Sequence, residues 1–570
     1  MQQHQFLRST KRLLFFIIIL LLTSCAAPAA APSATFDWEL IDVPLRVAYA
    51  FDAGSLDPAC ADPQDVLAAT VFNAVYQTLV TYDPGSTDVP PAIVPWLAES
   101  MPEPVNETDE KEWDFKLRRD VRFADGNSVT ARDVVYSFER LKRLEGAPAF
   151  LTDNIEAVEQ IDDYTVKFIL TQPDPALLPK LASGAFSIVN QGLLEDMRDA
   201  DSCSAENPLD FMSAGSGTYI LKERIIGESI LLERNDNYTD EQDEARPQAV
   251  IIQIMPDAET QFAELVAGNL DIALNLTPAQ LDEIANNPAY QTYQQSSVNL
   301  IALATNWNKP DNQTTDQTAQ QALRYAIDYA TILQEVGGAA LTPPSFIPNQ
   351  FLAANPEAGI KYDPENAARL MEQVGYSESN RLPVRLAYPK STAALGNSNW
   401  DRLAELVAEN LQQVYFDVET VGTDGDPLQV EPDLAPDLVL FDKGANYLDA
   451  LDYLDFLPGG RIANRFNWDN PELAEGRLRA LRAVDPDERT SNLMDLQQRL
   501  NETGPYAFIL LAGLQSAAGE SVSEWPPNPQ NILFIRRVKV SRYCRNCCNS
   551  CSPANTSDAC DLCRDNCTNC

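Results

Sequence analysis

Cysteine and histidine are the residue types of this 570-residue chain with the clearest capacity for chemistry, and their distribution is uneven: there are 11 cysteines but one histidine. That histidine, His4, lies in a segment that we expect to be removed from the mature protein. Its loss excludes Ser-His-Asp and Cys-His catalysis, the HExxH zinc motif and any histidine-ligated metal. The chain also contains no GxxxxGK[ST] loop and no GxSxG turn. The residues therefore disfavour an enzyme and indicate no cofactor.

Eight of the cysteines crowd into residues 544–570. This segment has almost no apolar residues, so any order in it must come from cross-links or from metal. Its CxxC and CxxxC steps suit one or two four-cysteine zinc or iron–sulfur sites, whereas an exported protein favours disulfides, and a disordered tail is the third alternative. The eight candidates are Cys544, Cys547, Cys548, Cys551, Cys560, Cys563, Cys567 and Cys570.

Two further cysteines, Cys60 and Cys203, lie in the body of the chain. Disulfides persist in exported proteins, and neither residue has another cysteine of the body to pair with. We therefore predict that Cys60 and Cys203 form a disulfide, which requires their Cα atoms to lie within about 7 Å. Two buried free thiols are the alternative.

The N-terminus has the features of an export signal. Basic residues at Arg8, Lys11 and Arg12 precede the apolar run Leu13–Leu22, which is too short to span a membrane. The run ends in Leu-Thr-Ser-Cys, which resembles the bacterial lipobox, so we expect cleavage before Cys25 and lipid on its sulfur. Residues 1–24 are then a signal peptide and residues 25–40 a lipidated N-terminus and tether. An ordinary signal peptide that happens to contain a cysteine is the alternative.

Charge limits the partners. The chain has 83 Asp and Glu against 42 Lys and Arg, a formal net charge of −41. Such a surface repels phosphate backbones, so we expect no nucleic-acid partner. Beyond the N-terminus, no stretch approaches the about 20 apolar residues that a membrane-spanning helix needs.

Strand-like and helix-like patterns alternate along the body, which predicts an α/β protein. Short apolar runs at 45–50 and 270–274 and the alternating segment 114–117 are typical of strands. Helical spacing predicts helices over 66–79, 259–267, 317–335 and 364–374, and Thr130 is placed to cap a helix that runs to Leu144.

An ordered set of short motifs between about residues 40 and 540 resembles the family 5 extracellular solute-binding proteins, which include the dipeptide- and oligopeptide-binding components of ABC importers. Each motif is weak alone, but the set is specific because the order and gaps agree. The motifs are Leu56–Pro58, Pro95–Ser100, Phe115–Arg118, Val121–Gly126, Thr130–Ser137, Gly215–Tyr219, Arg234–Tyr238, Gly268–Ala273, Gln320–Asp328 and Tyr362–Ala367. The cysteine-rich tail has no counterpart in the family.

The resemblance implies a fold like that of type II periplasmic binding proteins: two lobes, an extra third domain and a ligand cleft between the lobes. The expected segments are 41–70, 210–296 and 500–543 for domain I, 71–209 for domain II and 297–499 for domain III. It also implies a monomer that captures a peptide or other small molecule and delivers it to an ABC permease. A sensory protein that presents its ligand to a membrane receptor is the alternative, and a secreted hydrolase is the weakest one.

The resemblance also points to a recognition segment. Peptide-binding members commonly hold the peptide's α-ammonium with an aspartate, and the matching position here is Asn446, while Lys443 stands at the family's tryptophan position. A neutral amide forfeits the charge-assisted bond, and Lys443 offers a positive charge instead. We therefore expect weak binding of peptides with a free N-terminus, unless Asp449 or Asp452 replaces the aspartate.

Two tryptophans complete the candidate ligand contacts. Trp307 and Trp400 are able to stack on a sugar ring or a side chain, although tryptophan is more often a core residue.

The lipid anchor is directly testable. A Cys25→Ser variant has no sulfur to acylate, so we expect the wild-type protein to fractionate with membranes and the variant to be recovered in the soluble exported fraction. Equal solubility of the two exported proteins would contradict the anchor.

Overall fold

The computed structural model describes residues 44–83, 90–106, 110–195, 197–239, 246–390, 400–429, 434–526 and 528–540. These residues all belong to one compact unit, Val43–Cys570. The predicted signal peptide, Cys25 and the eight cysteines of the tail lie outside the described residues. No helix among those described is long and apolar enough to cross a membrane.

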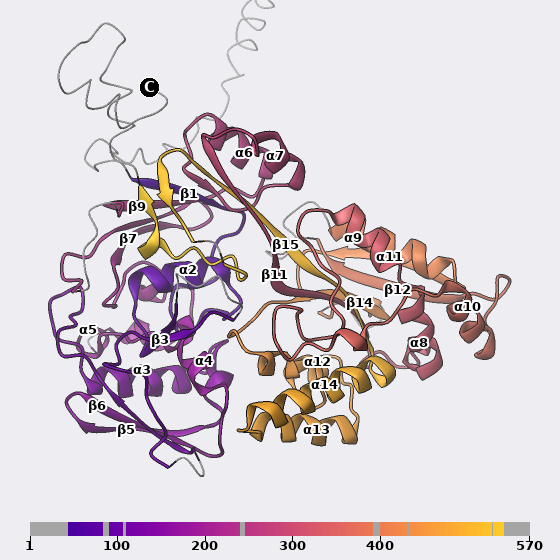
Figure 1. The fold of residues 1–570 in the computed structure, drawn as a ribbon, viewed down its shortest axis with the longest axis horizontal. Coiled ribbons are helices and arrows are strands. Elements are labelled where there is room, and N and C mark those ends of the chain that lie inside the picture. Colours follow the sequence, from indigo (N-terminus) through magenta and orange to yellow (C-terminus); the bar gives the residue numbers. More distant parts are fainter. Residues whose placement is uncertain are drawn as a thin grey trace, which may run out of the picture. The chain divides into compact units, whose positions relative to one another are not determined.

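A ten-stranded mixed sheet is the largest element of the structure (Figure 1). Two long strands at its middle, β11 (Tyr290–Thr305) and β15 (Tyr506–Gly519), pair in antiparallel fashion. In sheet order the strands are β13 (Phe416–Thr423), β12 (Leu382–Pro389), β14 (Leu438–Lys443), β11, β15, β10 (Ile272–Ala273), β1 (Leu45–Tyr49), β9 (Ala249–Ile254), β8 (Ser229–Arg234) and β7 (Tyr219–Ile225).

The half of this sheet that contains β12–β14 is covered by four helices: α8 (Gln317–Ala326), α9 (Tyr329–Val336), α10 (Pro364–Gln373) and α11 (Trp400–Gln412). Their apolar faces form one buried core with the strands, in which Leu323, Met371 and Leu440 take part. The single helix predicted over 317–335 is wrong. The chain leaves helical geometry at Ile327, and Asp328 then caps α9 by accepting a hydrogen bond from the Thr331 N–H at 3.1 Å.

The other half of the sheet packs on α2 (Val66–Val75), with Val47, Val71 and Ile252 in a shared core. Two short helices, α6 (Ala258–Val266) and α7 (Pro278–Ile284), pack near β10 and β15 around a small separate core. A pair of short strands, β16 (Val522–Glu524) and β17 (Lys539–Val540), ends the described chain. The α/β fold predicted from the sequence is confirmed.

Residues 80–194 form a smaller α/β layer. Strands β4 (Glu112–Lys116), β6 (Thr165–Leu170) and β5 (Ile155–Asp162) make an antiparallel sheet, and β2 (Val80–Tyr82) pairs with β3 (Ile93–Pro95). Helix α3 (Ala131–Leu144) packs on this sheet, with α4 (Leu177–Leu181) and α5 (Gln191–Leu194) close by. The predicted cap is confirmed: Thr130 and Asp133 form a capping box at the start of α3.

The segments expected to form domain I and domain III contribute strands to the same ten-stranded sheet, because β11 and β15 continue from one half to the other. Helices α12 (Arg461–Arg465), α13 (Pro471–Arg482) and α14 (Pro486–Thr503) follow β14 and precede β15. The exact domain boundaries remain predictions.

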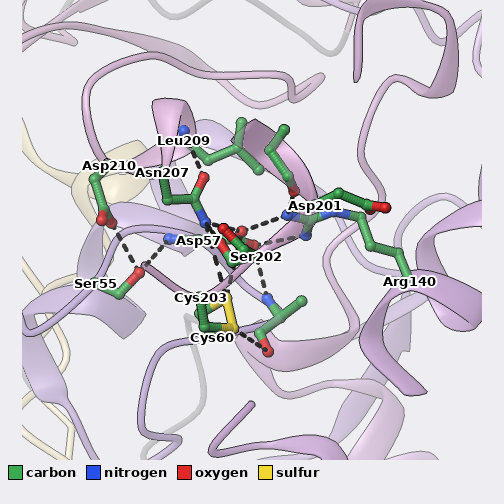
Figure 2. Close-up of polar contacts among 12 residues, drawn as sticks. Ser55, Asp57, Cys60, Arg140, Asp201, Ser202, Cys203, Asn207, Leu209 and Asp210 are labelled. Atoms are coloured by element: carbon green, nitrogen blue, oxygen red, sulfur yellow. Dashed lines mark hydrogen bonds and ion pairs between the residues drawn. A yellow bond between two sulfur atoms is a disulfide. The ribbon is translucent and has the colours of Figure 1, made fainter. Parts of the chain in front are cut away.

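A buried ion pair anchors the loop that precedes α2 (Figure 2). The guanidinium of Arg140, on α3, donates to both carboxylate oxygens of Asp57 at 2.8 and 2.5 Å, and both side chains are almost completely buried. The Asn207 amide donates to the same carboxylate at 2.6 Å. Asp57 therefore ties three separate segments of the chain together.

The disulfide predicted between Cys60 and Cys203 is present beside this ion pair, with Cα atoms 5.4 Å apart (Figure 2). Gly146 packs directly against it, since an added Cβ there would lie 2.2 Å from the carbonyl oxygen of Ala59 and 3.0 Å from Cys203 Sγ. The loop around Asp57 is thus held by one covalent and one ionic connection.

Removal of one ionic partner tests the contribution of the pair to stability. An Arg140→Met variant leaves the Asp57 carboxylate buried without its cation, so we expect the free energy of unfolding to fall by about 3–5 kcal/mol. Denaturant unfolding measures this change. The matched control is Arg143→Met on the same helix, because the Arg143–Asp201 pair is half exposed and should contribute less than about 1 kcal/mol. Equal losses in the two variants would contradict the assigned role.

Candidate functional site

The carboxyl ends of three parallel strands meet at one edge of the large sheet. Strand β12 runs parallel to both β13 and β14, so the chain leaves the sheet on the same side after Pro389, Thr423 and Lys443. In α/β sheets, ligands bind outside the carboxyl ends of the strands. A ligand site is therefore expected at this end of the three strands.

A pocket of about 320 Å³ opens at this edge, and its walls carry charges of both signs. Lys390 Nζ lies 3.0 Å from Asp424 Oδ1, and Arg465 donates to Asp426 Oδ1 at 2.6 Å. Asp442 is the fifth charged residue of the lining. These ion pairs are partly or largely exposed, so a solute can exchange with them at low cost.

The last residue of β14 and the loop after it contain the recognition residues predicted from the sequence. Lys443 is 2% exposed, and its ammonium donates to Asp452 Oδ2 at 2.6 Å and to the Gly444 carbonyl oxygen at 2.6 Å. It also lies 5.1 Å from the ring centroid of Tyr453. The expectation that Lys443 offers its charge to a ligand is wrong for this structure, because the charge is buried and paired.

Asn446 is part of the same buried network. Its backbone N–H and its side-chain amide donate to Asp452 at 2.9 and 2.7 Å, so the carboxylate accepts from Asn446 twice and from Lys443 once. Burial raises the pKa of Asp452, and the Lys443 ammonium offsets part of that shift. Because Asp452 is buried and already accepts three hydrogen bonds, it holds the loop together and is not open to a ligand's ammonium.

The loop also contacts a part of the chain far away in sequence. The amide of Gln64, just before α2, donates to Asn446 Oδ1 at 3.1 Å and accepts from the Gly444 N–H at 2.7 Å. Gly444 suits this contact, because an added Cβ would come within 3.1 Å of Gln64 Oε1. Sequence reasoning did not find Gln64, since nothing local marks it.

A second contact lies a few residues further on. The guanidinium of Arg461 stacks 3.6 Å from the ring centroid of Phe150, and it also bonds Asp455 at 3.2 Å and Asn446 Oδ1 at 3.3 Å. The Leu448 N–H donates to the hydroxyl of Tyr82 at 2.8 Å. Residues 444–461 therefore meet residues 64–150 through hydrogen bonds and one cation–π contact.

The structure separates the remaining candidates. Trp400 is wholly buried in the core between α11 and the sheet, so its predicted ligand contact is wrong here. Trp307 is 37% exposed, and its backbone N–H donates to the Phe466 carbonyl at 3.1 Å. Asp449 caps a short 3₁₀ helix (Ala450–Phe456) by accepting from the Leu451 N–H at 2.8 Å, and burial raises its pKa.

Within the described residues, no group of three or more Cys, His, Asp or Glu side chains is arranged to hold a metal ion. The eight cysteines of the tail lie outside the described residues, so the choice among disulfides, metal and disorder there stays open.

Comparison with known proteins gives a consistent picture. Residues 92–464 match the model of the bacterial extracellular solute-binding proteins, family 5. The chain is 26% identical over 506 residues to the "Probable D,D-dipeptide-binding periplasmic protein DdpA" of Escherichia coli, covering 85% of this chain and 92% of that protein. It is 24% identical over 517 residues to the nickel-binding periplasmic protein of the same organism, covering 85% and 92%.

The fold is also shared with solved structures. The dipeptide-binding protein of Pseudoalteromonas sp. SM9913, in complex with Met-Leu, superimposes with a TM-score of 0.76 at 20% identity, covering 88% of this chain and all of that one. At this level of identity the likeness shows the fold alone.

The buried Lys443–Asp452 pair predicts a pH-dependent loss of stability. In a Lys443→Met variant, Asp452 loses its cation and its folded-state pKa rises further above the unfolded value. An aspartate with a raised folded pKa destabilises the protein above that pKa, and the penalty shrinks as the carboxyl is protonated. We therefore expect the stability gap between variant and wild type to be largest near neutral pH and smaller at about pH 5. Urea unfolding at both pH values measures it.

A Lys222→Met variant is the control, since the Lys222–Glu233 pair is largely exposed. Its gap from wild type should be small at both pH values. A Lys443→Met gap that stays constant with pH would contradict the assigned pairing.

Proposed function

Because the chain belongs to the bacterial extracellular solute-binding proteins of family 5, we propose that it is the substrate-binding lipoprotein of an ABC importer. It captures a small solute outside the membrane, is anchored there by lipid on Cys25, and delivers the solute to a membrane permease. The relatives point in the same direction, since their names describe periplasmic binding proteins for dipeptides and for nickel.

The observation that carries the proposal is the charged pocket at the carboxyl ends of β12–β14, next to the loop that Gln64 contacts. Asp442 lines the pocket, and Lys443 and Gly444 follow it directly in the chain. A solute bound there lies beside the contact between residues 444–461 and residues 64–150. Closure of that contact over the solute would exclude water and strengthen its polar interactions.

The charges of the pocket indicate the class of solute. Lys390 and Arg465 suit a carboxylate, and the three aspartates of the lining suit a cationic group. We propose a small zwitterionic or similarly mixed-charge solute, such as a peptide-like molecule. The sequence predicted weak binding of peptides with a free N-terminus, because Asn446 is neutral. In this proposal the pocket aspartates hold the ammonium instead, and the Asn446 side chain already bonds Asp452, Gln64 and Arg461.

The name of the nickel-binding relative does not support nickel held by a histidine of this chain. A protein histidine cannot hold the metal here, because the only histidine is His4. Mass spectrometry of the small molecule released from the purified, denatured protein is the most direct way to identify the solute.

Once the solute is identified, the pocket can be tested by substitution. We expect a Lys390→Ala, Arg465→Ala variant to bind it at least about tenfold more weakly, because even one lost charge-assisted bond is worth about 1.5–3 kcal/mol and about 1.4 kcal/mol is a factor of ten in affinity. Isothermal titration calorimetry measures the affinity. An Arg479→Ala variant is the control, since Arg479 pairs with Glu475 on the exposed face of α13. Unchanged affinity in the double variant, with a normal melting temperature, would place the solute elsewhere.

A further inference from the structure

A second and larger cavity, of about 560 Å³, lies beside β15. It shares no lining residue with the charged pocket. Much of its wall is apolar and includes Pro343, Pro344, Phe351 and Phe508. No Asp, Glu, Lys, Arg or His is among its lining residues, and its polar side chains are neutral amides and hydroxyls such as those of Asn349, Gln350 and Thr342.

One side of this cavity is formed by a part of β15 that has no neighbouring strand, among those described, on the side opposite β11, although Tyr506, Ala507 and Phe508 there are buried. Strand β15 lies between β11 and β10, but β10 pairs only with Ala517 and Ala518. Nearer the start of β15, Leu511 exchanges two backbone hydrogen bonds with Leu341, at 3.2 and 2.7 Å. The chain then continues from Thr342 into Pro343 and Pro344, which have no N–H to donate, so the pairing stops there.

The backbone of β15 faces the cavity where this pairing stops. The Pro505 carbonyl accepts from the Thr305 N–H at 3.0 Å and therefore points toward β11. Successive residues of a strand alternate in the direction of their backbone groups, so those of Tyr506 and Phe508 point to the opposite edge. The β-bulge of this pairing lies after Phe508, opposite Ile301, and it turns the backbone of Leu511 to the same edge. Both residues line the cavity. In the described part of the chain, no backbone hydrogen bond from outside the sheet reaches either of them.

We propose that this cavity is a second ligand site, which takes a short, extended, uncharged ligand with amide groups. The ligand pairs with the N–H and C=O groups of Tyr506 and Phe508, as a peptide does when it adds a strand to a sheet edge. Its side chains pack on the proline and phenylalanine walls. A volume of about 560 Å³ is within the ordinary range of small-molecule sites.

The absence of charge in the lining selects the ligand class. Burial of a free ammonium or carboxylate without an oppositely charged partner is costly, so a peptide with ionised termini is favoured less in this cavity than in the charged pocket. The two sites therefore differ in chemistry, and the proposal stands independently of the function proposed for the pocket. This chain's own loop 342–360 bounds the cavity. The ligand is therefore a small free molecule and not a segment of a large partner.

Gly359 allows a clean test. It lines the cavity, and its φ of −59° is open to any residue. An added Cβ there would meet Pro344 Cα at 3.8 Å, an ordinary contact. A Gly359→Trp variant fills the cavity with an indole, whereas Gly359→Ala adds one methyl group. The probe is N-acetyl-leucyl-leucinamide, a neutral capped dipeptide, in calorimetry with the full mature chain.

We expect wild type, Gly359→Ala and the Lys390→Ala, Arg465→Ala variant to bind the capped dipeptide equally, and Gly359→Trp to bind it at least tenfold more weakly. Amide hydrogen exchange of the wild type gives a readout that needs no variant: the probe should slow exchange at Tyr506 and Phe508. The proposal is overturned if the wild type does not bind, if exchange there is unchanged, or if only the Lys390→Ala, Arg465→Ala variant loses binding. The last result would move the probe to the charged pocket and leave the proposed function intact.

Discussion

The buried ion pair between Asp57 and Arg140 is the interaction on which the arrangement of the site depends. It fixes the loop before α2 against α3, with Asn207 as a third partner. A few residues further along that loop, Asp65 caps α2 through the Ala68 N–H, and Gln64 reaches Gly444 and Asn446. A buried carboxylate without its cation would be expensive, so the pair leaves this loop few alternative positions. The Asp57–Arg140 salt bridge therefore helps to position Gln64 for its contact with Gly444 and Asn446, although it lies outside the candidate site.

Charges in this protein are divided between those that hold the structure and those that are open to a solute. Lys443 and Asp452 neutralise each other in the interior, and their donors and acceptors are taken up by the loop itself. Lys390 and Arg465 lie at the carboxyl ends of parallel strands with pairs that are partly or largely exposed. Similar residue types therefore differ in whether a solute can reach them, and burial decides this difference. The second cavity extends this division, because its lining has no charged group at all.

Local signals were enough for much of the fold. The signals for α3 are all local: Thr130 and Asp133 form its capping box, and its apolar residues repeat at helical spacing directly after them. The helix begins and ends where these signals predict. The helix predicted over 317–335 failed because Asp328 starts a new helix, while its own N–H bonds Asn410, 82 residues away. The same limit applies to the site. Gln64 and Asn446 are 382 residues apart, and nothing near either residue indicates the other.

Lys443 and Trp400 show why residue type alone did not identify the ligand contacts. An exposed lysine and a buried, paired lysine look identical in a sequence, and here Asp452, nine residues on, decides between them. Trp400 is the first residue of α11 and lies on the face of the helix that packs into the core, so its ring is buried and does not face solvent. The charged pocket was missed because its residues are far apart in the sequence: they come from the ends of β12 and β14, from the end of β13 and the loop after it, and from Arg465 at the end of α12.

The disulfide between Cys60 and Cys203 closes a covalent ring over a separation of 143 residues. In the chain-entropy account, a ring of that size disfavours the unfolded state by about 5 kcal/mol. This contribution is absent in a reducing cytoplasm and appears only after the thiols are oxidised. In the exported lipoprotein proposed above, the disulfide would therefore add its stabilisation only after export, and the reduced chain in the cytoplasm would be easier to unfold than the mature protein.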